Sequence, residues 1–158
     1  MSEVTNIIVA GLGGQGVLKV TDILAEALFR SGFDVKKSEV HGMSQRGGSV
    51  SSEVRFGDAV ASPMVPAGEC DYLVVIDASQ VDVVKDKLRA GGFLLTPDDV
   101  PKEKLANPKA LNTMLLGALS VKLPVKEELW REVLSSAFPE KIRALNLDMF
   151  ELGRNAAK

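Results

Sequence analysis

The hexapeptide Gly11-Leu12-Gly13-Gly14-Gln15-Gly16 decides how this chain folds. The apolar run Ile7–Ala10 precedes it, and a helical pattern begins at Val17, so the order predicts a strand, a tight turn and a helix. Glycines let a ligand approach the backbone, and the first N–H groups of a helix favour an anion. The spacing matches G-x-G-x-x-G, the dinucleotide fingerprint, although a single match is a weak argument and a tight turn without a ligand is the alternative.

The first 38 residues follow a β-α-β pattern. Asn6–Ala10 is apolar without alternation, which predicts a strand buried at the centre of a parallel sheet. A helix is predicted over Gly16–Arg30, where apolar residues recur every three or four positions, and Ser31-Gly32 ends it with a glycine cap. Phe33–Ser38 is the predicted second strand.

The pattern changes after Ser38. Glu39–Gly48 is a ten-residue, polar segment with three glycines and no helical periodicity, and Ser49–Phe56 then alternates apolar and polar residues. A parallel crossover needs about a dozen residues. The third strand is therefore predicted to be antiparallel to a neighbour, with one face in water or against a partner. Gly57-Asp58 is a turn signal, and Ala59–Ser62 is predicted to complete a hairpin.

The second half contains two more strands and is then helical. Asp71–Ile76 and Phe93–Thr96 are the predicted strands, and a helix between them is predicted over Ser79–Ala90, with Gly91-Gly92 as its end. The last three helices are predicted over Leu111–Lys122, Val125–Phe138 and Pro139–Leu152, and Gly153 is expected to close the last one.

These elements predict an α/β fold: a Rossmann-like three-layer αβα arrangement with a mixed, mostly parallel sheet and C-terminal helices. We expect residues 1–158 to form a single domain. Met114, Trp130 and Phe150 fit either the core or a subunit interface, and the sequence does not separate these two hypotheses.

Composition narrows the class of function. Apolar residues make up 46% of the chain, charged residues 25%, and the net charge is −2, which gives no electrostatic reason to expect nucleic acid or an anionic membrane as a partner. No apolar run approaches the roughly 20 residues of a membrane helix. The first five residues lack the basic region of a signal peptide, so a cytoplasmic location is the expectation.

The chain contains one cysteine, Cys70, and one histidine, His41. One cysteine excludes an internal disulfide and an iron–sulfur cluster held by this chain alone, because such a cluster needs about four thiolates. One histidine and one cysteine do not make the usual zinc site. Metal or redox chemistry is therefore expected in a partner, and Cys70 is expected to be a small buried residue.

Two loops carry the candidate site residues. Gln15 places an amide, both donor and acceptor, at the glycine turn. The segment His41–Gly48 is expected at the same sheet edge and gathers His41, Gln45 and Arg46 among glycines. Arg46 suits a phosphate or carboxylate, and His41 titrates near neutrality or donates a hydrogen bond. The alternative for each is a loop residue whose polar groups are hydrogen-bonded within the protein and which binds no ligand. Asp77 is interpreted as a helix N-cap.

Two other hypotheses follow from the glycine fingerprint. Glu39 lies about 20 residues beyond it, where a dinucleotide fold places its ribose-binding acid, so a free-standing nucleotide-binding or regulatory domain is the alternative. A small dehydrogenase has less support, because the sequence contains no Tyr-x-x-x-Lys or His–Asp pair for hydride transfer.

The two loops together resemble the gamma-type subunit of 2-oxoacid:ferredoxin oxidoreductases, and within that family they are most similar to the indolepyruvate branch, where this subunit is called beta. The segments that carry the resemblance are GLGGQG (11–16), SEVHGMSQRGGSVSSEVRFG (38–57), LNTMLLGAL (111–119) and PEKIRALNLDMFELGR (139–154). GLGGQG alone is unspecific, whereas its pairing with EVHGMSQRGG is highly specific.

The resemblance implies a non-autonomous subunit of an enzyme that oxidatively decarboxylates a 2-oxoacid, with aryl pyruvates as the expected substrates. It implies a large partner subunit that holds thiamine diphosphate, magnesium and iron–sulfur clusters, with ferredoxin as electron acceptor and CoA as co-substrate. It assigns no catalytic residue to this chain. The implied substrate- or cofactor-facing residues are Gly11, Gly13, Gly14, Gln15, Gly16, His41, Gln45, Arg46, Gly47 and Gly48. The chain is expected to be shorter than its relatives between Gly92 and Asn112.

Overall fold

The computed structural model describes residues 3–41 and 48–158. Short 3-10 turns lie at Ala78–Gln80, Lys85–Lys87, Pro97–Asp99, Lys102–Lys104 and Pro108–Ala110. The strands and α-helices of the described residues are β1 (Thr5–Leu12), α1 (Val17–Arg30), β2 (Asp34–His41), β3 (Ser49–Gly57), β4 (Cys70–Val75), α2 (Val81–Val84), β5 (Leu88–Leu95), α3 (Leu111–Ser120), α4 (Glu127–Ala137) and α5 (Glu140–Ala157).

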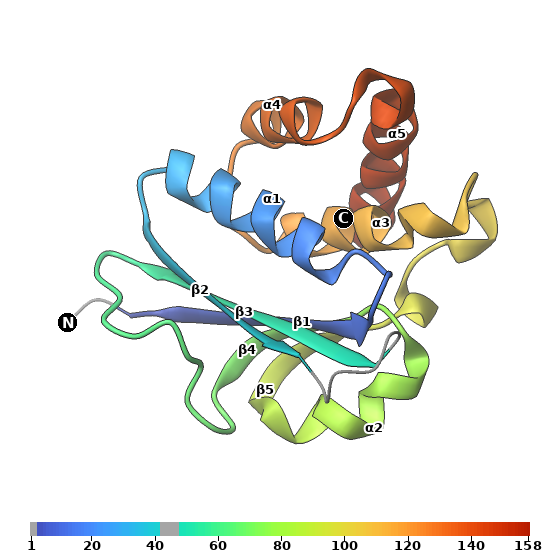
Figure 1. Cartoon of the computed structure of the whole chain (residues 1–158). Coiled ribbons are helices and arrows are strands. Elements are labelled where there is room, and N and C mark those ends of the chain that lie inside the picture. Colours follow the sequence, from blue (N-terminus) through green and yellow to red (C-terminus); the bar gives the residue numbers. More distant parts are fainter. Residues whose placement is uncertain (1–2, 42–47) are drawn as a thin grey trace.

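The strands form one mixed sheet in the order β2-β3-β1-β4-β5, with β1 at its centre (Figure 1). β3 is antiparallel to both of its neighbours, β1 and β2, whereas β1 and β4 are parallel and so are β4 and β5. The predicted antiparallel third strand is therefore confirmed. Because β3 alone runs against the other described strands, the prediction of a mixed, mostly parallel sheet is also confirmed.

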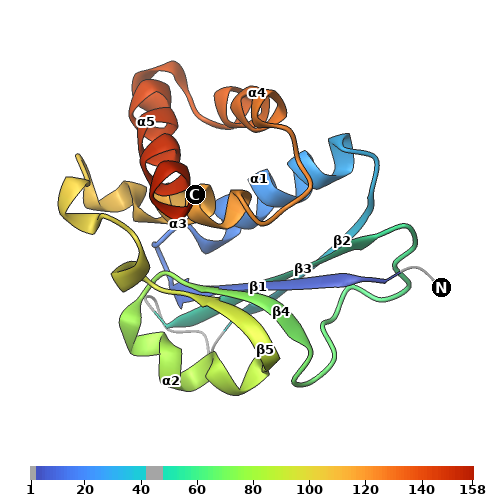
Figure 2. The same cartoon turned by 180° about the vertical axis from the view of Figure 1, so that it is seen from behind.

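Helices cover the two faces of the sheet unequally. α1, α3, α4 and α5 lie on one face and the short α2 lies on the other, as both views show (Figures 1 and 2). The larger apolar cluster lies under the first group of helices, and a smaller one, which includes Ile8, Leu73 and Val84, lies on the α2 side. The three-layer α/β architecture predicted from the sequence is confirmed. None of the described helices is both long and apolar enough to cross a bilayer.

The start and end of α1 follow from glycines in its flanks. Gly16 precedes the helix at φ +79°, a left-handed conformation. At the other end the N–H of Phe33 donates to the Leu28 carbonyl and that of Gly32 to the Phe29 carbonyl, which closes the helix as the Ser31-Gly32 pair predicted.

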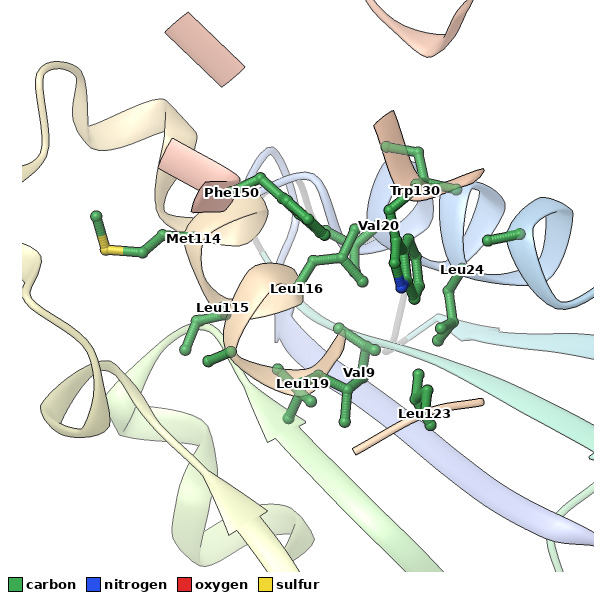
Figure 3. Packing of buried hydrophobic residues seen from close by; sticks show 14 of the residues in the cluster. Val9, Val20, Leu24, Met114, Leu115, Leu116, Leu119, Leu123, Trp130 and Phe150 are labelled. Carbon is green, nitrogen blue, oxygen red and sulfur yellow. The ribbon is translucent and has the colours of Figure 1, made fainter. Parts of the chain in front are cut away.

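Met114, Trp130 and Phe150 belong to the core, because each has 0% of its surface exposed. The Trp130 and Phe150 rings lie 5.7 Å apart between centroids, and Figure 3 shows both in the apolar cluster that also contains Leu116 and Val20. Helix α3, which carries Met114, is buried along nearly its whole length because it lies between the sheet and the other helices. The tertiary structure thus decides between the two hypotheses that the sequence left open for these residues.

Two glycines let α3 and α5 cross with their backbones in contact. A Cβ atom on Gly153 would lie 1.9 Å from the Met114 carbonyl oxygen, and one on Gly117 would lie 2.1 Å from the Phe150 carbonyl oxygen. Gly153 was expected to end the last helix, but α5 continues to Ala157. This prediction was wrong because the glycine serves helix packing rather than helix termination.

The predicted helix over Ser79–Ala90 was also wrong. Only Val81–Val84 is α-helical, and β5 already begins at Leu88. Gly91 and Gly92 therefore lie inside a strand, where the pairing of β4 with β5 is irregular between Cys70 and Tyr72. Gly91 has φ +77°, so the glycine pair permits this irregularity instead of ending a helix.

Two further boundaries differ from the prediction. Ala59–Ser62 does not complete a hairpin, because β3 already pairs with a strand on each side and leaves no edge for another partner. β2 is longer than predicted and extends to His41, so Glu39 lies in a strand and not in a loop.

We expect Gly153→Ala to lower the free energy of unfolding by about 3 kcal/mol, the upper range for overpacking a core, because the new methyl group meets a carbonyl oxygen of α3. Urea denaturation followed by the fluorescence of Trp130 measures the change. Asn155→Ala, at an exposed position of the same helix, is the control and should shift the value by less than about 0.5 kcal/mol. Equal effects of the two substitutions would contradict the close crossing.

Candidate functional site

The glycine turn lies at the carboxyl end of β1, the central strand, and leads directly into α1. This is the sheet edge where open α/β folds bind their ligands. α1 has no side-chain cap at its N-terminus and no acidic residue in its first turn. The local electrostatics of the turn therefore favour an anion, through the N-terminal N–H groups and the helix dipole.

The glycines of the hexapeptide have different structural roles. Gly11 is buried in β1, and a Cβ there would lie 2.9 Å from the Gln15 Oε1 atom. Gly14 has φ +89°, and no atom of the described residues lies within 4 Å of the position that a Cβ would take. Gly16 has φ +79°, and a Cβ there would lie 2.2 Å from Asn112 Nδ2. Of these three, Gly14 has the geometry of a ligand-facing residue, and the other two admit neighbouring side chains.

The second predicted loop reaches the same sheet edge. Leu12, the last residue of β1, pairs with Ser49, the first residue of β3, and the N–H of Gly13 donates to the Gly48 carbonyl over 2.9 Å. The structure therefore brings Gly48 to the glycine turn. β2 ends at His41, and Gln45, Arg46 and Gly47 lie outside the described residues.

The Gln15 side chain is held in place by two hydrogen bonds of 2.7 Å each. Its Oε1 accepts from the Leu12 N–H, and its Nε2 donates to Asp77 Oδ2. The amide thus joins Gln15 to Leu12 within the turn and also bonds the turn to Asp77, in the segment that follows β4.

Asp77 has a larger role than the helix cap predicted from the sequence. Its Oδ1 accepts from the Ser79 N–H at 3.0 Å and from the Ser79 hydroxyl at 2.6 Å, which confirms the cap. The Ser79 hydroxyl, the Gln15 amide and the Ser79 N–H together lower the pKa of Asp77. Because the folded-state pKa is lowered, the stability from these bonds is present above the unfolded pKa and is lost as the pH falls through the folded one.

Asn112, at the start of α3, is a site residue that the sequence did not predict. It is 7% exposed, its Nδ2 donates to the Gly16 carbonyl at 3.2 Å, and its Oδ1 accepts from the Thr113 N–H at 2.8 Å. Thr113 in turn donates to Asn146 of α5. The sequence signal that could have identified Asn112 is an amide at the start of a mostly apolar predicted helix.

A shallow hollow of about 170 Å³ opens beside the turn. Its described lining contains one lysine, Lys109, and no carboxylate; these lining residues are Gly14, Gln15, Ile76, Pro108, Lys109, Leu111 and Asn112. A larger hollow, about 850 Å³, lies at the opposite ends of the strands, where Asn6, Asp71 and Arg89 lie close to the starts of β1, β4 and β5. We place the candidate site at the smaller hollow, because the carboxyl ends of the strands, the N-terminus of α1 and the glycine turn meet there, and Gly48 contacts that turn.

The described residues offer no group of three or more His, Cys, Asp or Glu side chains that would hold a metal ion. Cys70 is buried as predicted, and its burial raises the pKa of the thiol to about 12. A thiol with that pKa is protonated at neutral pH and is not a ready nucleophile.

The topology gives the dinucleotide hypothesis no support. In a dinucleotide fold the acidic residue follows the strand adjacent to β1. Here β3 lies between β1 and β2, so the strand that carries Glu39 is displaced from β1 by two strand spacings, about 10 Å. Glu39 forms an ion pair with Lys37.

Comparison with known proteins identifies the class. Residues 6–156 match the family described as pyruvate ferredoxin/flavodoxin oxidoreductase, and the chain belongs to this family. The gamma subunit of a keto/oxoacid ferredoxin oxidoreductase from Geobacter sulfurreducens superposes with a TM-score of 0.79 at 27% identity, covering 97% of this chain and 98% of that one. The chain is thus a small subunit of a 2-oxoacid:ferredoxin oxidoreductase.

Relatives in the family are named for different 2-oxoacids. The indolepyruvate oxidoreductase subunit IorB of Thermococcus kodakarensis is 34% identical, over 97% of this chain and 96% of its own length. The ketoisovalerate oxidoreductase subunit VorA of Methanothermobacter thermautotrophicus is 31% identical over 95% of this chain but only 36% of its own length. The first alignment spans 193 positions against 158 residues here, so that relative has residues without a counterpart in this chain. Their location between Gly92 and Asn112 stays a prediction.

We expect Gly16→Ala to destabilise the chain more than Gly14→Ala. Both substitutions carry the cost of a left-handed alanine, about 1–2 kcal/mol, but only the methyl group at position 16 meets Asn112. Adding Asn112→Ala to Gly16→Ala removes that clash, so a double-mutant cycle should give a coupling energy of about 1 kcal/mol or more. Urea denaturation measures all four variants. Additive effects at positions 16 and 112 would contradict the contact.

Proposed function

We propose that this chain is the small, non-cluster subunit of a thiamine diphosphate-dependent enzyme that decarboxylates an aryl pyruvate, passes the electrons to ferredoxin and forms an acyl-CoA. The observation that carries the proposal is the similarity to the indolepyruvate subunit along nearly the full length of both chains. The single domain predicted for residues 1–158 is part of this proposal, as is a cytoplasmic location.

Thiamine diphosphate, magnesium and the iron–sulfur clusters are assigned to a large partner subunit. A cluster needs about four thiolates, and this chain has one cysteine, which is buried. No catalytic step is assigned to a residue of this chain. Its proposed contribution is to complete the end of the active site where the 2-oxoacid and CoA bind.

The proposed ligand-facing surface is formed by the glycine turn and the His41–Gly48 segment. The hydrogen bond between Gly13 and Gly48 supports a shared surface. An anionic co-substrate such as CoA suits this edge, because α1 has no acidic residue in its first turn and the described residues that line the hollow beside the turn include Lys109 and no carboxylate. Gly11, Gly13, Gly14, Gln15, Gly16, His41, Gln45, Arg46, Gly47 and Gly48 remain the proposed site residues.

The test is anaerobic co-expression of this chain with its large subunit. The complex is expected to reduce ferredoxin with indolepyruvate and CoA, and to use indolepyruvate in preference to ketoisovalerate or 2-oxoglutarate, as measured by kcat/KM for each acid. The large subunit purified without this chain is the control. Full activity of the large subunit alone would exclude the proposed role, and a preference for another acid would exclude the proposed substrate class.

Arg46 provides a second test, based on the sequence alone. We expect Arg46→Ala to lower the turnover of the complex without changing the melting temperature of this subunit, since an arginine in a glycine-rich loop suits a carboxylate or phosphate. Arg30→Ala, at the exposed end of α1 where Arg30 pairs with Glu26, is the matched control. Wild-type kinetics for Arg46→Ala would remove Arg46 from the proposed site.

A further inference from the structure

We propose that Asp77 is a positioning residue for the glycine turn and acts through Gln15. The inference deepens the proposed function and rests on it, because the turn is the part of this chain proposed to face the co-substrate. It starts from a relay of two hydrogen bonds, in which the Leu12 N–H donates to Gln15 Oε1 and Gln15 Nε2 donates to Asp77 Oδ2, each at 2.7 Å.

The Leu12 end of this relay fixes which groups donate and which accept. The Leu12 N–H is a donor only, so the Gln15 side chain must present its oxygen to Leu12 and its NH₂ group to residue 77. An acceptor is therefore required at position 77, where Asp77 Oδ2 fills that place.

The other oxygen of Asp77 is already occupied. Oδ1 accepts both the N–H and the hydroxyl of Ser79. A helix cap needs one acceptor oxygen, which asparagine or serine also supplies. The two tasks together need two acceptor oxygens, and a carboxylate is the side-chain group that has them.

The relay sets the shape of the turn. The Gln15 amide lies over Gly11, where a Cβ would come within 2.9 Å of Oε1, and the Gln15 N–H donates to the Leu12 carbonyl at 3.2 Å. Leu12 and Gln15 are thus joined through both the main chain and the side chain. The arrangement also keeps the negative charge on Asp77 and leaves a neutral amide at the turn, where an anionic ligand is proposed to bind.

The test uses the complex of this chain with its large subunit. Asp77→Asn keeps an acceptor for Ser79 but places an NH₂ group against that of Gln15. We expect faster hydrogen exchange at the Leu12 amide and about a tenfold rise in the KM for CoA, which corresponds to ~1.4 kcal/mol, with a smaller change in kcat. Ser79→Ala, which removes one contact to Oδ1 and leaves the relay intact, is the control and should change neither quantity.

The double variant Gln15→Glu/Asp77→Asn separates positioning from folding. The carboxylate introduced at position 15 would accept from the Leu12 N–H and from the NH₂ group of the asparagine introduced at position 77. The carbonyl oxygen of that asparagine would still accept from Ser79, so every hydrogen bond is restored with the charge moved onto the turn. We expect protection of the Leu12 amide to recover while the KM for CoA stays raised, because a carboxylate then faces an anion.

Two results would overturn the inference. One is wild-type exchange and wild-type KM in Asp77→Asn, and the other is a folded double variant in which the Leu12 amide stays unprotected. Failure of the proposed function is a different result, namely a wild-type complex that does not oxidise any 2-oxoacid. Hydrogen exchange at Leu12 reports on the relay even in that case.

Discussion

The antiparallel pairing of β3 with β1 governs how the sheet and its loops are arranged. β3 lies between β1 and β2, with Ser49 opposite Leu12 and Phe56 opposite Thr5. This register brings Gly48, the last residue of the second glycine-rich segment, against Gly13 of the glycine turn. It also moves β2 and Glu39 away from the central strand. The same strand therefore creates the candidate site and removes the geometry of a dinucleotide fold.

The helical layer holds that edge in place from above the sheet. α3 is buried along nearly its whole length, and its first turn carries Asn112, whose amide donates to the Gly16 carbonyl. α5 fixes α3 in turn, through the close approach at Gly117 and Gly153 and through the bond between Thr113 and Asn146. A turn that is proposed to present backbone N–H groups to a ligand gains from such support, because binding then costs less ordering of the chain.

Local patterns predicted the elements whose cause is local. The strand, glycine turn and first helix follow from periodicity and capping, and the antiparallel third strand follows from a connection too short for a crossover. Predictions failed where a glycine has a tertiary cause. Gly153 resembles a helix end in the sequence but makes room for a neighbouring carbonyl oxygen, and Gly91 and Gly92 resemble a helix stop but allow an irregular strand pairing. A glycine in the sequence indicates that the backbone has an unusual requirement, but it does not show whether that requirement is a helix end, a close helix contact or an irregular strand pairing.

The order of the amino acids was enough to establish the fold class, the presence of two glycine-rich segments and, with one cysteine, the need for a partner in any cluster chemistry. The pairing of the side chains that hold the turn could be identified only in the folded chain. Gln15 and Asp77 are 62 residues apart in the chain, and Asn112 is 96 residues from Gly16. Hydrogen bonds between residues so far apart produce no regular spacing in the sequence, because each partner fits only the pattern of the element in which it lies. Their polarity becomes visible only when the chain is folded and each donor faces its acceptor.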